Sequence, residues 1–134
     1  MPASEHIRIA ADLAEVGPAA DRVRDLAVSA LGEAGGQAVE LAFVEAANNV
    51  IQHGFPDGQG ELDIFVHTHT EGVTLELYDC GRPMPSDALE GADEPEDPFA
   101  ESSRGLWLIR VLMDEISYET DSGINRLVLT KRMA

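Results

Sequence analysis

Apolar and polar residues alternate along several stretches of this chain, in the pattern that half-buried β-strands produce. Strict alternation directs successive side chains to opposite faces of a sheet, so one face can be buried while the other meets water. The alternating stretches are residues 6–10, 62–67, 73–78, 116–119 and 124–130. Turn-forming residues, Glu71-Gly72 and Asp121-Ser122-Gly123, separate two pairs of these stretches and predict hairpins.

Apolar residues recur at helical spacing in the remaining regular parts of the chain. Pro18 suits the first turn of one helix, and Gly35-Gly36 are expected to end it. A second helix is predicted from about residue 37 to residue 53, and a third over residues 106–113.

One long segment, residues 82–103, fits neither pattern because it is rich in proline and contains the acidic cluster Asp93-Glu94-Pro95-Glu96-Asp97. A loop of ~20 residues inside a small domain is usually functional or disordered. The element order predicts a single α+β domain over residues 1–134. We expect a two-layer sandwich with a mixed, mostly antiparallel sheet and helices on one face.

Charge and cysteine content indicate which kinds of partner and which cellular compartment suit this chain. The 134 residues include 9 basic and 25 acidic side chains, for a formal net charge of −16. Direct nucleic-acid binding is disfavoured because neutralising phosphates requires clustered Lys and Arg, whereas a partly basic protein partner is favoured. The single cysteine fits a reducing compartment. We expect a cytoplasmic protein with no membrane association, since we find neither a signal-peptide pattern nor a long apolar run.

Glu45 and Asn49 are the first candidate functional pair. Residues four apart share one face of a helix, so a carboxylate and a neutral oxygen ligand are expected side by side. Such a pair suits a hard cation with phosphate, or a hydroxyl that must lose its proton. Asn48 and Asn49 are poor helix formers in the middle of a helix, and such local conflicts tend to mark function. The structural alternative is a polar stripe at the edge of an amphipathic helix.

Two shorter motifs accompany this pair. Asp79-Cys80-Gly81 ends a predicted strand, where an acid can accept a hydrogen bond from an exocyclic amine and glycine lets a flat ring approach. The alternative is an ordinary turn after a strand. Residues 102–106 precede a predicted helix, whose free N–H groups can bind phosphate, although a plain serine N-cap explains them equally well.

Together these segments resemble the motifs of the GHKL (Bergerat) ATP-binding fold, and within it the anti-sigma-factor serine kinases of bacterial partner-switching modules. The match covers nearly the whole chain. The segments that resemble the N box, the adenine box, the second glycine box and the terminal strand are residues 45–54, 79–81, 104–109 and 127–132.

The resemblance implies a role for each candidate residue, with ATP and Mg²⁺ as cofactors. Asn49 would coordinate Mg²⁺ between the ATP phosphates, and Glu45 would act as general base on a substrate hydroxyl. Asp79 would bind the adenine amino group beside Gly81. The remaining implied contributors are the lid over residues 82–104, the phosphate-binding segment Ser103, Arg104, Gly105 and Leu106, the pocket-wall residue His53, and Thr130 as an adenine contact.

The function implied by the resemblance is phosphorylation of a small STAS-type anti-sigma antagonist, in alternation with binding a sigma factor. The resemblance also implies a homodimer. Two departures from the family pattern favour an alternative, a catalytically weak nucleotide-sensing binding module. Ser103 replaces the first glycine of its box, and Gly123-Ile124-Asn125 replaces Gly-Thr-Thr. A histidine-kinase catalytic domain is a weaker alternative because no dimerisation helix pair with a phosphoacceptor histidine precedes the fold.

Overall fold

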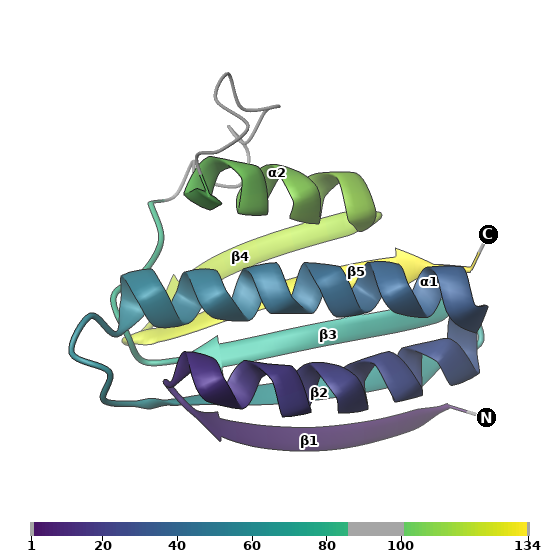
Figure 1. The fold of residues 1–134 in the computed structure, drawn as a ribbon, viewed down its shortest axis with the longest axis horizontal. Coiled ribbons are helices and arrows are strands. Elements are labelled where there is room, and N and C mark those ends of the chain that lie inside the picture. Colours follow the sequence, from purple (N-terminus) through teal and green to yellow (C-terminus); the bar gives the residue numbers. More distant parts are fainter. Residues whose placement is uncertain (1, 86–100, 134) are drawn as a thin grey trace.

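Five strands form one sheet in the computed structural model, which describes residues 2–85 and 101–133 (Figure 1). The strands lie in the order β1-β2-β3-β5-β4. The α+β class is confirmed, and each pairing among the described strands is antiparallel, so the expectation of a mixed sheet is corrected. The strands are β1 (Ala3–Ala10), β2 (Glu61–His69), β3 (Gly72–Asp79), β4 (Glu115–Asp121) and β5 (Ile124–Arg132).

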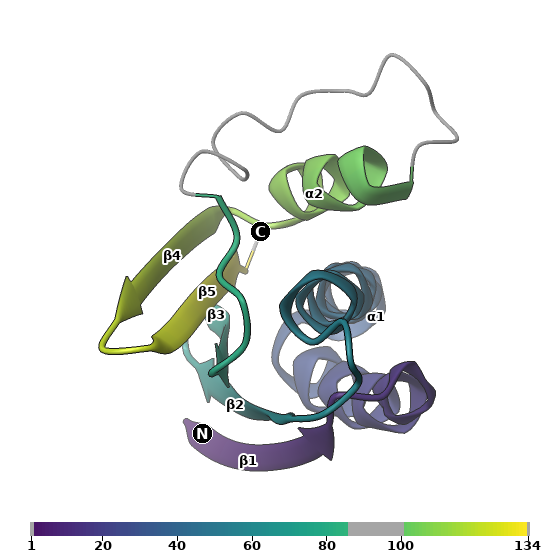
Figure 2. The same cartoon turned by 90° about the vertical axis from the view of Figure 1, so that its left-hand side faces the viewer.

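Helices cover one face of this sheet, as predicted (Figures 1 and 2). The 3₁₀ turn η1 (Leu13–Glu15) leads into α1 (Val16–Gly54), and α2 (Glu101–Leu112) lies beside the later part of α1. None of the helices in the described parts of the chain is long and apolar enough to cross a membrane.

A bend divides α1 into two arms, which we call the first arm (residues 16–31) and the second arm (residues 33–54). The bend occurs at Gly32, with φ 84° and ψ 178°, and not at Gly35-Gly36 as the sequence indicated. Glycine tolerates this left-handed φ at no steric cost. The two arms therefore fold back side by side over the sheet (Figure 2).

Gly36 has a packing role instead of a terminating one. A Cβ atom at Gly36 would lie 2.3 Å from Val28 Cγ2 and 2.9 Å from the Val28 backbone nitrogen. Only a residue without a side chain permits the two arms to approach this closely. Farther from the bend, Arg24 of the first arm and Glu40 of the second form an ion pair at 3.5 Å.

The core lies between the arms and the inner face of the sheet. Alternate residues of each central strand are fully buried there, which confirms the strand pattern predicted from the sequence. Burying one such aliphatic side chain stabilises the fold by about 1.5–3 kcal/mol. The largest contributors include Phe43, Leu62, Ile64, Leu75, Leu77 and Leu129.

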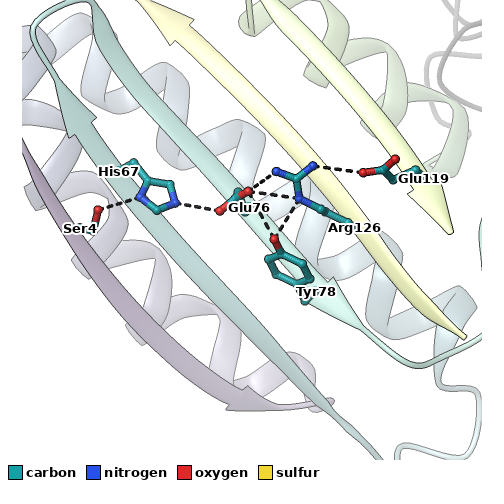
Figure 3. Close-up of polar contacts among 6 residues, drawn as sticks. All are labelled: Ser4, His67, Glu76, Tyr78, Glu119 and Arg126. Carbon is teal, nitrogen blue, oxygen red and sulfur yellow. Dashed lines mark hydrogen bonds and ion pairs between the residues drawn. The ribbon is translucent and has the colours of Figure 1, made fainter. Parts of the chain in front are cut away.

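The outer face of the sheet carries a hydrogen-bonded row of polar side chains (Figure 3). His67 contacts both Ser4 Oγ and Glu76 Oε2 at 2.8 Å, and Arg126 donates to Glu76 and to the Tyr78 hydroxyl. Burial raises the pKa of Glu76, but hydrogen bonds from His67 and Arg126 outweigh it and hold the pKa below its usual value. Glu76 is therefore ionised, and it joins His67 to Arg126 in this row.

Candidate active site

The candidate site forms where the end of the second arm meets the end of β3. The Arg82 N–H donates to the Gly54 carbonyl at 2.9 Å and joins the two segments. A Cβ at Gly81 would lie 2.6 Å from the Gly54 oxygen and 2.8 Å from Phe55 Cζ. Only glycine fits at position 81, so the backbone after β3 packs directly on the helix end.

Asp79 points to the helical side of the sheet and is 7% exposed. Its Oδ1 accepts hydrogen bonds from the Gly81 N–H at 2.8 Å and from Asn125 Nδ2 at 2.9 Å. Burial raises the pKa of the Asp79 carboxyl, and these two hydrogen bonds oppose the rise. The other oxygen, Oδ2, has no hydrogen-bond partner among the described residues and can accept one from a ligand.

Glu45 and Asn49 are both half-buried on one side of the second arm. Asn49 Nδ2 contacts Met84 Sδ at 3.2 Å, which leaves Asn49 Oδ1 available within the described residues. The Glu45 carboxylate likewise forms no hydrogen bond or ion pair with any described residue. A carboxylate and a neutral amide oxygen, four residues apart on this helix, are thus both available within the described residues.

This donor set fits a magnesium ion only when phosphate supplies further ligands. Mg²⁺ takes oxygen ligands in octahedral geometry and is usually held by one or two protein groups plus substrate phosphates. Across the described ranges, no cluster of three or more His, Cys, Asp or Glu side chains is arranged to hold a metal by itself. The amide oxygen of Asn49 is the group suited to a phosphate-bound ion.

Gly105 brings α2 against Glu45. A Cβ at this buried position would lie 2.7 Å from Glu45 Oε2, closer than real Cβ contacts. α2 begins at Glu101, earlier than predicted, so Gly105 lies beyond the first turn. Because only the first four N–H groups of a helix lack an intrahelical acceptor, the structure explains Gly105 by close packing and not by a free N–H.

The remaining predicted residues have different outcomes. Leu106 is half-buried and packs against the core, whereas His53 is exposed in the last turn of α1. The backbone of Ser103 and Arg104 belongs to α2, and their side chains lie outside the description. Most of the predicted lid, residues 86–100, also lies outside the described residues.

Thr130 is not brought to this site. In the sheet it pairs with Thr74, whereas Asp79 pairs with Asn125 near the other end of the same two strands. Leu127 and Leu129 face the core, so alternation turns Thr130 to the outer face. The expected adenine contact at Thr130 is corrected, and Asn125, missed as a site residue, takes the position beside Asp79.

A separate hollow of about 790 Å³ lies over the outer face of the sheet. It does not include Glu45 or Asn49, although Asp79 and Cys80 border it where β3 ends. Ring contacts form its floor, with His6 stacked on Phe65 at 4.5 Å and Tyr78 edge-on to Phe65 at 5.6 Å. The helical side and the outer face of the sheet are therefore both candidate positions for a ligand.

Comparison with known proteins settles the family. The model of the histidine kinase-like ATPase domain matches residues 9–131. The chain belongs to this family. The resemblance carried by the sequence motifs is thereby confirmed.

Curated relatives include the serine-protein kinase RsbW of Halalkalibacterium halodurans, 28% identical over 99 residues that cover 69% of this chain and 60% of that protein. The serine-protein kinase RsbW of Bacillus cereus is 26% identical over 96 residues, covering 67% and 60%. The chain thus spans about 60% of the length of the relatives it matches.

Solved structures share the fold. The RsbU and RsbW domains of Rv1364c from Mycobacterium tuberculosis match with a TM-score of 0.66 at 17% identity, covering 97% of this chain and 32% of that chain. The histidine kinase domain of the blue-light activated histidine kinase EL346 from Erythrobacter litoralis matches with a TM-score of 0.54 at 18% identity. That match covers 90% of this chain and 60% of the other. Both likenesses concern the fold alone.

Proposed function

We propose that this chain is an ATP- and Mg²⁺-dependent protein serine/threonine kinase. The observation that supports the proposal is that Glu45 and Asn49, four residues apart on α1 and both half-buried, keep a carboxylate and an amide oxygen without partners among the described residues. The nearby Asp79 acceptor and the glycine contacts of Gly81 and Gly105 add support. The names of the RsbW relatives agree with this activity.

Each residue contributes to phosphoryl transfer by position and charge. Asp79 accepts a hydrogen bond from the adenine amino group, and Gly81 lets the ring approach the backbone. Asn49 would hold a magnesium ion, which would neutralise phosphate charge when bound. Glu45 would accept the proton of the substrate hydroxyl as the hydroxyl oxygen bonds to the terminal phosphorus of ATP and the bond from that phosphorus to the departing ADP breaks. The close packing of Gly105 fixes where the Glu45 carboxylate lies.

The substrate and partners follow from the family resemblance. We propose a small STAS-type anti-sigma antagonist as the phosphoacceptor and a sigma factor as the alternative partner, in the cytoplasm and with the kinase as a homodimer. A net charge of −16 favours partners with basic contact surfaces and disfavours direct binding to nucleic acid.

The proposal is tested with γ-labelled ATP, Mg²⁺ and a purified STAS-type antagonist from the same organism. Wild type should label the antagonist. Glu45→Gln should lower the transfer rate by at least about 100-fold, as for loss of a general base, while the ATP Kd changes less than about threefold. Glu40→Gln is the matched control because Glu40 lies on the same arm but pairs with Arg24.

The outcomes separate the candidate functions. Normal labelling by Glu45→Gln would refute the base assignment. ATP binding by wild type without transfer to any serine or threonine would favour a nucleotide-sensing binding module, for which the replacement of a motif glycine by Ser103 is the sequence signal. Failure to bind ATP at all would contradict the proposal.

A further inference from the structure

Asn125 is a polar side chain buried in an otherwise apolar row. It is 1% exposed, and the next inward-facing residues of β5, Leu127 and Leu129, are both buried and apolar. Burying an amide is unfavourable unless its hydrogen-bonding groups find partners. A valine or leucine here would extend the core more simply, so the position is specialised for hydrogen bonding.

The Asn125 amide is fully engaged with the residues beside it. Its Nδ2 donates to Asp79 Oδ1 at 2.9 Å and to the Gly81 carbonyl at 3.0 Å. Its Oδ1 accepts from Thr120 Oγ1 at 2.8 Å. The reversed amide would direct an oxygen at two acceptors, the Asp79 carboxylate and the Gly81 carbonyl, so this orientation is the favoured one.

We propose that Asn125 is a positioning residue that fixes Asp79 as an ionised acceptor aimed at the nucleotide base, and thereby selects bases with an exocyclic amine over bases with a carbonyl at that position. The proposal rests on the proposed function, because Asp79 is assigned there to base recognition. The family pattern has a hydroxyl-bearing residue at this position, and the proposal gives Asn125 a role there.

The selection follows from which carboxylate oxygen remains available. Oδ1 already accepts from the Gly81 N–H and from Asn125, so Oδ2 is the atom offered to the ligand. An ionised carboxylate can only accept hydrogen bonds, which suits the amine of adenine and repels the carbonyl oxygen of hypoxanthine.

Loss of Asn125 should weaken this selection. Gly81 and Asn125 donate to Asp79 Oδ1, and Gly54 lies close to it on the packed helix end; among the described residues, none of these three carries a side-chain charge. Burial already raises the pKa of Asp79, and the amide of Asn125 is one of two hydrogen-bond donors opposing that rise. Without it the acid is protonated at higher pH and presents an O–H group that a carbonyl can accept.

The test compares ATP and ITP, which differ in the amine and the carbonyl, by calorimetric titration with Mg²⁺ at pH 7.5. Asn125→Leu should reduce the ratio of ATP affinity to ITP affinity by at least about tenfold, the scale of one charge-assisted hydrogen bond. Thr130→Val is the matched control, since Thr130 lies on the same strand but faces outward, and its ratio should equal that of wild type. An unchanged ratio in Asn125→Leu would overturn the proposal.

A positioning role is separated from a merely structural one by two further measurements. In an Asp79→Asn background, Asn125→Leu should no longer alter the ratio; an equal loss there would show that Asn125 does not act through Asp79. If Asn125→Leu does not fold, the smaller Asn125→Ala replaces it, because it also removes the Nδ2 donor to Asp79 and Gly81. A wild-type ratio in a folded Asn125→Ala would also count against the proposal.

The ligand-free protein distinguishes failure of this inference from failure of the proposed function. Carboxyl carbon NMR should show a higher pKa for Asp79 in Asn125→Leu than in wild type, whether or not any nucleotide binds. Absence of ATP binding by wild type would refute the proposed function and the base selection with it. An equal Asp79 pKa in both proteins would refute the positioning role by itself.

Discussion

Replacing Gly105 by alanine should slow phosphoryl transfer without lowering the stability of the fold. The added Cβ would lie 2.7 Å from Glu45 Oε2, whereas ordinary contacts begin at 3.4 Å. The flexible Glu45 side chain can yield, and its carboxylate oxygen reaches ordinary contact by moving the difference, 0.7 Å. A displacement of about 1 Å at a reacting group can lower a rate about 100-fold. We therefore expect transfer to fall by about 10- to 100-fold.

The same change should leave the fold intact or stabilise it. Alanine is favoured over glycine inside a helix by up to about 1 kcal/mol, and position 105 lies within α2. Urea denaturation should give a midpoint at or above that of wild type. The ATP Kd should change less than about threefold, because the carboxylate of Glu45 is assigned to the substrate hydroxyl and not to the nucleotide.

Gly17→Ala is the matched control for this experiment. Gly17 also lies in a helix, but nothing stands within 4 Å of the Cβ that alanine would add. Its transfer rate should equal that of wild type. If Gly105→Ala transfers phosphate as fast as Gly17→Ala, the carboxylate position does not control the chemistry and the assignment of Glu45 is refuted.

The bend of α1 and the outer face of the sheet give two predictions about stability. Gly36→Ala should destabilise the fold by about 1–3 kcal/mol in urea denaturation, since its Cβ would meet Val28 side-chain and backbone atoms at 2.3 and 2.9 Å; an unchanged midpoint would contradict this packing. Glu76→Gln should cost about 1–2 kcal/mol at pH 7, where the carboxylate is ionised and bonded to Arg126 and His67. Because folding lowers the pKa of Glu76, that advantage of wild type is present above the ordinary Glu pKa and is lost as pH falls through the folded value. A difference that stays constant from pH 7 to pH 3 would argue against the ion pairs as its source.

The sheet was predictable because alternation reports directly on burial. Leu62, Ile64 and Val66 occupy the inner face as their spacing required. The end of the first helix was predicted at Gly35-Gly36, whereas the bend lies at Gly32, because the sequence alone does not distinguish the conformations of these three glycines. Which of them adopts a positive φ depends on how the arms pack, and only the structure shows that contact.

The placement of the candidate residues in the fold was predictable where they lie on one helix, and less so where two strands must first be paired. Glu45 and Asn49 are related by helical spacing alone, so their shared face followed from the sequence. Asn125 meets Asp79 only through the register of β3 and β5. The alternation of Leu127 and Leu129 was the available signal, since it directs Asn125 inward and Thr130 outward.

Binding of a nucleotide on the helical side of the sheet is tested most directly by NMR. The ¹⁵N-labelled chain is titrated with Mg²⁺ and a nonhydrolysable ATP analogue, and shifts are mapped onto the structure. We predict that the largest changes occur at Asn49, Gly81 and Gly105. Changes confined to Phe65 and Tyr78, which border the hollow on the outer face, would contradict the account.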